Sequence, residues 1–132
     1  MTALPLTAGT TLLIVLLMFG TAWNVGHKRG KYGVKAPAVS GHEQFERAYR
    51  IQMNTIEWAL IFLPTLWIFA AFVSDRYATW AGLVGLAGRI WYAMAYQRDP
   101  AARGGGYLLG MLPFAVASMW AGVAVVRAIA AQ

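Results

Sequence analysis

Four stretches of mostly apolar residues, separated by short polar connections, take up nearly all of the 132-residue sequence. They predict helices at about residues 6–26, 40–73, 77–98 and 106–130. A helix that crosses a membrane needs roughly 20 apolar residues, and each stretch is about that long or longer. The pattern therefore predicts an all-α fold for residues 1–132: a single integral membrane domain in which four helices form an antiparallel up-down bundle.

The two connections at one end of this bundle contain residues that end helices. Residues 27–39 combine glycines, a proline and four basic side chains, and residues 99–105 contain Asp-Pro followed by glycines. Both are therefore predicted to be loops. Ser40 with Glu43 matches the S-x-x-E capping box, which predicts that the second helix begins at Ser40.

The composition supports a membrane protein and narrows its chemistry. The chain is 59% hydrophobic and 12% charged, whereas a soluble domain has about 25% charged residues. It has no cysteine, which excludes disulfides, thiolate metal sites and a cysteine nucleophile. His27 and His42 are too far apart in sequence, and have too few carboxylates around them, to predict a metal site.

The formal net charge of +6 is attributed to membrane topology and anionic lipid, and no nucleic-acid partner is predicted. Basic residues concentrate in cytoplasmic loops, so residues 27–39 and 99–105 are expected to be cytoplasmic and both termini to lie on the opposite side. The first apolar segment lacks a basic region before it and is interpreted as a retained span. The alanine-rich composition suggests a bacterial inner membrane.

A stripe of polar residues interrupts the apolar pattern of the second predicted helix, and the third carries a matching face. The spacings of three and four residues place each set on one side of its helix: Glu43, Arg47, Arg50, Asn54 and Glu57 in the second helix, and Arg89, Tyr92 and Tyr96 in the third. An arginine or acid near the bilayer centre costs at least about 2.5 to 3.5 kcal/mol. Asn54, Glu57 and Arg89 lie deepest and must therefore face other protein or water.

Two interpretations of this face stay open. Glu57 and Arg89 could form a structural ion pair between two helices, which would stabilise the bundle only weakly. Alternatively, the arginines, tyrosines and amides line a pocket for a small ligand that is mostly anionic and also carries a cation. Glutathione, a tripeptide with two carboxylates and one amine, is one such molecule, although the composition alone does not select it from among anionic ligands. An adjacent guanidinium would lower the pKa of its thiol, for which the cysteine reference is about 8.5.

Two motifs resemble those of a known family. Residues 46–57 read E-R-x-Y-R-x-Q-x-N-x-x-E, and residues 89–96 read R-x-x-Y-x-x-x-Y, with Arg103 following. This pattern resembles the MAPEG superfamily, the membrane-associated proteins of eicosanoid and glutathione metabolism. Within it, the pattern is most similar to the branch of the cysteinyl-leukotriene-forming synthase and the microsomal glutathione S-transferases 2 and 3.

The resemblance implies a homotrimer that binds glutathione between neighbouring subunits near the cytoplasmic face. It assigns glutathione contacts to Arg29, Arg50, Gln52, Asn54, Glu57, Arg89, Tyr92 and Tyr96, and stabilisation of the thiolate to Arg103. Two positions depart from the synthase pattern. Trp58 replaces a tyrosine, which removes one hydroxyl contact, and Gly30 replaces a second arginine, which argues against leukotriene synthesis in particular.

The leading functional hypothesis is a glutathione-dependent membrane transferase or peroxidase. It would use glutathione as co-substrate, without a metal, against lipophilic electrophiles or hydroperoxides that enter from the lipid. One alternative is a non-catalytic lipid-binding scaffold of the same superfamily, against which the full arginine and tyrosine set argues. The other is a small proton-coupled drug exporter. Such exporters carry an acid in their first helix, whereas residues 6–25 here contain no ionisable side chain.

Overall fold

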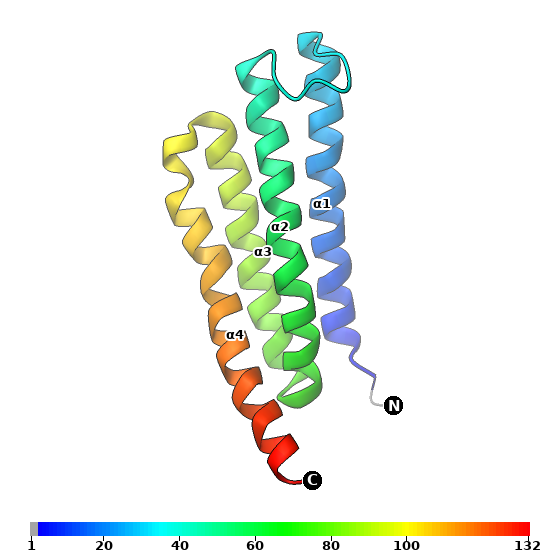
Figure 1. Cartoon of the computed structure of the whole chain (residues 1–132), viewed down its shortest axis with the longest axis vertical. Coiled ribbons are helices and arrows are strands. Elements are labelled where there is room, and N and C mark those ends of the chain that lie inside the picture. The colour runs from blue at the N-terminus through cyan, green and yellow to red at the C-terminus, as the bar shows by residue number, and fades with distance from the viewer. Residues whose placement is uncertain (1–2) are drawn as a thin grey trace.

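The computed structural model describes residues 3–132 and contains only helices in that part of the chain. The elements are α1 (Pro5–Tyr32), α2 (Glu43–Phe72), α3 (Asp75–Arg98), the short 3₁₀ helix η1 (Pro100–Arg103) and α4 (Gly104–Ala130). The long helices run alternately up and down, so the N- and C-terminal ends lie at one end of the bundle (Figure 1). The α1–α2 and α3–α4 connections lie at the other. The predicted all-α architecture of four antiparallel helices is confirmed.

Helices α2 and α3 form the centre of the bundle, and each of them contacts both α1 and α4 (Figure 1). The core around Trp58 and Phe62 of α2 includes Ile14 of α1, and small residues such as Ala78 and Ala117 fill the end near the termini. The outer surfaces carry many large apolar side chains that are exposed in the single chain. A surface of this kind suits a lipid environment rather than water.

Three segments are long and apolar enough to cross a membrane: Pro5–Tyr32, Glu43–Phe72 and Pro100–Ala130. Helix α3 is not among them, and it contains four charged residues, of which Arg89 lies in its interior. Its 24 residues correspond to about 36 Å at about 1.5 Å per residue. That length exceeds the bilayer core of about 30 Å. Hydropathy thus supports three of the four predicted spans.

The first helix is longer than predicted: it continues to Tyr32, whereas the prediction ended it near residue 26. Residues 27–32 of the predicted loop are therefore helical. Neither Gly26 nor Gly30 ends the helix, because a glycine with ordinary helical geometry lowers helix stability without stopping it. Gly33 ends it instead: its φ of 67° is left-handed, and the Val34 N–H donates to the Arg29 carbonyl over 3.1 Å.

The predicted capping box at Ser40 is wrong, since α2 begins at Glu43 and His42 is its N-cap. The His42 Nδ1 accepts a hydrogen bond from the Gln44 N–H at 3.1 Å, and Glu46 Oε1 accepts one from the Gly41 N–H at 3.0 Å. Gly41 has a φ of 140°, a backbone conformation that residues other than glycine rarely adopt. This backbone conformation prevents the helix from beginning three residues earlier, at Ser40.

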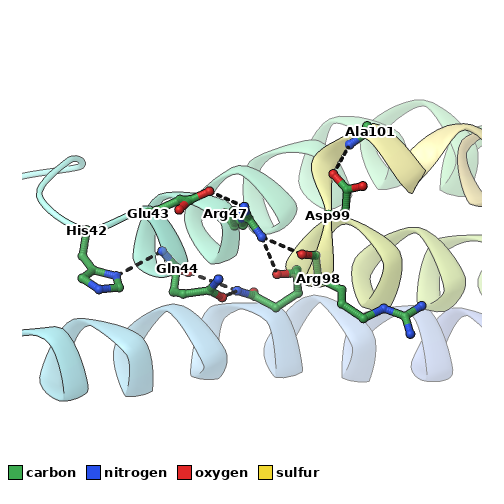
Figure 2. Close-up of polar contacts among 8 residues, drawn as sticks. His42, Glu43, Gln44, Arg47, Arg98, Asp99 and Ala101 are labelled. Carbon is green, nitrogen blue, oxygen red and sulfur yellow. Dashed lines mark hydrogen bonds and ion pairs between the residues drawn. The ribbon is translucent and has the colours of Figure 1, made fainter.

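The second predicted loop, residues 99–105, is almost entirely helical. Asp99 ends α3, and its carboxylate accepts a hydrogen bond from the Ala101 N–H at 3.0 Å, which begins η1 (Figure 2). Helix α4 then starts at Gly104, so the glycines that predicted a flexible loop form its first turn. The small size of Gly105 and Gly106 is needed for packing. A Cβ on Gly105 would lie 2.6 Å from the Trp91 ring.

Helices α3 and α4 approach each other through glycines, and this contact sets the position of the polar residues beside it. A Cβ on Gly88 would overlap the backbone of Leu109 and Gly110, and one on Gly106 would overlap the backbone of Tyr92. The two backbones can therefore come together only because no side chain separates them. This brings the α3 segment around Arg89 against the first turns of α4.

The substitution Gly88→Ala is expected to destabilise the bundle by about 1–3 kcal/mol, because the added methyl group must push two backbones apart. Thermal unfolding in detergent, followed by circular dichroism, measures the effect. The matched control is Gly122→Ala in α4, where an added Cβ meets nothing within 4 Å. There alanine should be neutral or stabilising, as it favours helix by up to about 1 kcal/mol. Equal melting temperatures for the two variants would contradict the glycine contact.

Candidate functional site

A cavity of about 350 Å³ lies between α2, α3 and the η1–α4 segment, and we call it the arginine pocket. Its lining comprises Asn54, Glu57, Trp58 and Ile61 from α2, Arg89 and Tyr92 from α3, and Arg103, Tyr107 and Met111 from η1 and α4. Five of the nine predicted site residues thus share one cavity. Its volume falls within the range of about 300–1,000 Å³ typical of small-molecule sites.

Arg89 is the most deeply buried charged residue of the pocket, with 2% of its surface exposed. Its Nη2 lies 3.5 Å from Thr55 Oγ1, and its Cζ lies 4.0 Å from the centre of the Tyr92 ring. Within residues 3–132 its Nε has no hydrogen-bond partner, and it makes no ion pair with Glu57. The ion-pair interpretation of these two residues is therefore wrong. A buried guanidinium without a carboxylate is costly, and an anionic ligand would relieve that cost.

The remaining polar groups lie around this guanidinium. Asn54 Nδ2 donates to the Tyr92 hydroxyl over 2.6 Å, which leaves the hydroxyl proton free to donate to a ligand. The Tyr96 ring lies 5.6 Å from that of Tyr92 and 5.8 Å from Arg103 Cζ, so Tyr96 borders the pocket without lining it. Arg103 is exposed and donates one hydrogen bond to the Pro100 carbonyl at 2.9 Å. Its other donors have no hydrogen-bond partner among residues 3–132.

Trp58, which replaces the tyrosine of the synthase pattern, has a structural contact of its own. It is buried, and its indole N–H donates to the Gly110 carbonyl at 3.0 Å, which links α2 to α4. Its polar group is thus directed at protein and not at a ligand. Sequence reasoning did not identify Tyr107 and Met111. The signal that could have identified them is their position four and eight residues after Arg103. This spacing places all three side chains on one helical face.

Three predicted site residues lie outside the arginine pocket of the single chain. Arg29 Nη1 donates to the carbonyls of Val34 and Ala38 at 3.2 and 2.8 Å, so it holds the α1–α2 connection in place. Arg50 is exposed and Gln52 is half-buried, and neither lines the pocket. They lie on α2 nearer the connection end than Asn54 and Glu57.

Arg47, the other arginine of the polar stripe, joins α2 to the end of α3 (Figure 2). Its Nη1 donates to the carbonyls of Gln97 and Arg98 at 3.2 and 2.7 Å, and its Nη2 pairs with Glu43. The last carbonyls of a helix have no partner within that helix, and Arg47 supplies one here. This contact fixes the residues immediately before η1, the element that carries Arg103.

Comparison with known proteins yields one family and several relatives. The model of the MAPEG family matches residues 7–124. An uncharacterized protein of Synechocystis is 44% identical over 107 residues, which cover 81% of this chain and 75% of that protein. Microsomal glutathione S-transferase 2 of Homo sapiens is 39% identical over 90 residues, or 68% of this chain. Leukotriene C4 synthase of Cavia porcellus is 37% identical over 98 residues, or 74% of this chain.

The matched segments make up 61% of the human transferase and 65% of the guinea-pig synthase, less than two thirds of either. Both matches cover at least two thirds of this chain, as does the Synechocystis match.

Proposed function

The chain belongs to the MAPEG family and is a membrane protein, and from this premise we propose that it is a glutathione-dependent transferase for lipophilic electrophiles. The carrying observation is Arg89, a buried guanidinium without a carboxylate partner in the described chain, which lines a cavity together with Arg103. The names of two relatives, a glutathione S-transferase and a leukotriene synthase, support the same chemistry.

The pocket offers a partner for each charged group of glutathione. Arg89 would bind a carboxylate, since a guanidinium presents paired donors to two oxygens. Glu57 is exposed and lines the same cavity, so its carboxylate would receive the ammonium group. The hydrogen-bonded pair of Asn54 and Tyr92 would orient the peptide between them.

Arg103 is the proposed catalytic residue. Its positive charge favours the thiolate of glutathione over the thiol, and the released proton passes to water. The thiolate sulfur then forms a bond to an electrophilic carbon, from which a leaving group departs with the bonding electrons. Reduction of a lipid hydroperoxide by the same thiolate is the related peroxidase reaction. The large exposed apolar residues of the outer surface are consistent with substrate that arrives from the lipid.

We further propose that the working unit is a homotrimer in which a neighbouring subunit completes the site. Arg29, Arg50 and Gln52 match glutathione-contacting positions of the family pattern but lie outside the pocket of one chain. A neighbour that packs against the pocket would bring them to the ligand. In this arrangement α3 also crosses the membrane, with Arg89 shielded by protein, and the two basic connections face the cytoplasm.

Titration calorimetry of the purified protein with glutathione tests the binding step, and conjugation of an aromatic halide tests the reaction. We expect saturable binding and turnover that depends on both substrates. Native mass spectrometry should give three chains per particle. Absence of saturable binding would favour the lipid-binding scaffold. Proton-driven drug transport by the protein in proteoliposomes, without conjugation, would favour the exporter.

A further inference from the structure

A second and larger groove, of about 830 Å³, lies between α1, α2 and α3, and we call it the α1–α3 groove. It shares no lining residue with the arginine pocket. Its walls are largely apolar and come from Leu17, Gly20, Thr21, Ile51, Ile90, Ala93 and Met94. Its remaining lining residues are polar: Asn24, Gln44, Gln97 and Arg98. The groove is thus apolar along most of its length and polar towards the connection end of the bundle.

Arg98 supplies the only charge in this groove. Its backbone carbonyl accepts a hydrogen bond from Arg47, but its guanidinium has no hydrogen-bond or ion-pair partner among residues 3–132. In Figure 2 the Arg98 side chain extends away from that contact and makes no marked interaction. A permanent cation beside apolar walls attracts an anionic group. The groove therefore favours an occupant with a negatively charged group.

The three amides beside Arg98 add hydrogen-bonding capacity. The Gln97 side chain accepts a hydrogen bond from Asn24 Nδ2 at 3.4 Å and donates one to Gln44 Oε1 at 2.8 Å. Helices α1, α2 and α3 therefore each contribute one amide to this network. Asn24 Oδ1 and Gln44 Nε2 have no partner among the described residues. One acceptor oxygen and one NH2 group therefore remain available for the ester and hydroxyl groups of a ligand.

We propose that the α1–α3 groove binds one anionic glycerophospholipid of the surrounding bilayer. An acyl chain lies against the apolar walls, where Ile90 and Met94 are 42% and 68% exposed. The phosphate lies on Arg98 and the glycerol region on the amides. Basic pockets between transmembrane helices bind anionic head groups in this manner. A zwitterionic lipid carries a second, positive group near Arg98 and binds less well.

Native mass spectrometry of the detergent-purified protein tests this, with phosphatidylglycerol and phosphatidylcholine of identical acyl chains as probes. The unaltered protein should retain phosphatidylglycerol preferentially. Arg98→Gln should weaken phosphatidylglycerol binding about fivefold and remove the preference. Arg76→Gln, which removes the same charge at the opposite end of α3, should leave both unchanged. Equal binding of the two lipids, or an Arg98 variant that behaves like the unaltered protein, would overturn the proposal.

A second pair of variants tests the apolar part of the groove. An added Cβ on Gly20 meets nothing within 4 Å, so Gly20→Leu can fill the groove without a clash at its first atom. It should reduce binding of both lipids, while Gly122→Leu, at a similarly open position outside the groove, should not. If Gly20→Leu instead separates the subunits, the groove is an interface between copies of this chain and the lipid assignment is wrong. Conjugation of glutathione by Arg98→Gln should equal that of the unaltered protein.

Discussion

Replacing Arg103 by alanine is expected to lower the rate of glutathione conjugation about 10- to 30-fold at neutral pH. The thiol of free cysteine has a pKa of about 8.5, so only a small part of glutathione is ionised near pH 7 without help. The Arg103 guanidinium lines the pocket and retains free donors, and in the proposed mechanism its charge lowers the pKa of the bound thiol. At pH 7 a thiol with a pKa of about 8.5 is about 3% ionised, so a variant that loses the pKa shift keeps about one thirtieth of the thiolate.

The pH dependence of the rate separates this role from a structural one. The unaltered protein should reach its plateau below the pKa of the free thiol, whereas the rate of Arg103→Ala should continue to rise up to that pKa. The deficit therefore shrinks as the pH increases. Glutathione affinity should change far less than kcat. Arg127→Ala, a loss of the same charge in the last turn of α4, is the control and should keep the normal profile. A uniform loss at every pH would refute thiolate stabilisation by Arg103.

The helices could be predicted from the sequence because apolar stretches of this length have few alternatives, but several of their ends could not. Gly30 and Gly33 look alike in sequence, yet only Gly33 adopts the left-handed conformation that ends α1. The glycines at residues 104–106 similarly suggest a loop. Gly105 and Gly106 are instead part of the surface that lets α4 approach α3, a property that depends on the partner helix and not on local sequence.

The candidate site could be predicted in part for a related reason. Asn54 and Glu57 lie on one face of α2, and Arg89 and Tyr92 lie on one face of α3, so packing the two faces together forms most of the pocket. The contact of Trp58 with Gly110 requires knowledge of the α2–α4 distance, which spacing alone does not give. For Arg29 the family pattern, rather than the spacing, was insufficient. Its matching position in the family pattern does not reveal that its donors hold a loop within this chain.

Replacing Arg89 by methionine is expected to abolish glutathione binding without destabilising the protein. Methionine is unbranched and fills a buried space flexibly, and exchange of a buried ionic group for a well-packed apolar one is often neutral or stabilising by about 1–4 kcal/mol. Among residues 3–132 Arg89 has no carboxylate partner, so its removal leaves no acid unpaired. Its one hydrogen bond, to Thr55, is long. If Arg89 served only to stabilise the bundle, its replacement would lower the melting temperature and leave glutathione binding unchanged.

Arg47→Met is the matched control, because Arg47 is an arginine of the same α2–α3 interface whose Nη1 and Nη2 groups both have partners within the protein. Its loss leaves the part-buried Gln97 carbonyl without this partner, which should cost about 1 kcal/mol. Thermal unfolding with and without saturating glutathione compares the two. Ligand at 100 times its Kd stabilises a protein by about 2.7 kcal/mol, so Arg47→Met should melt lower yet still be stabilised by glutathione. Arg89→Met should melt as high as the unaltered protein and show no such shift. If glutathione still raises the melting temperature of Arg89→Met, the buried guanidinium is not the carboxylate site.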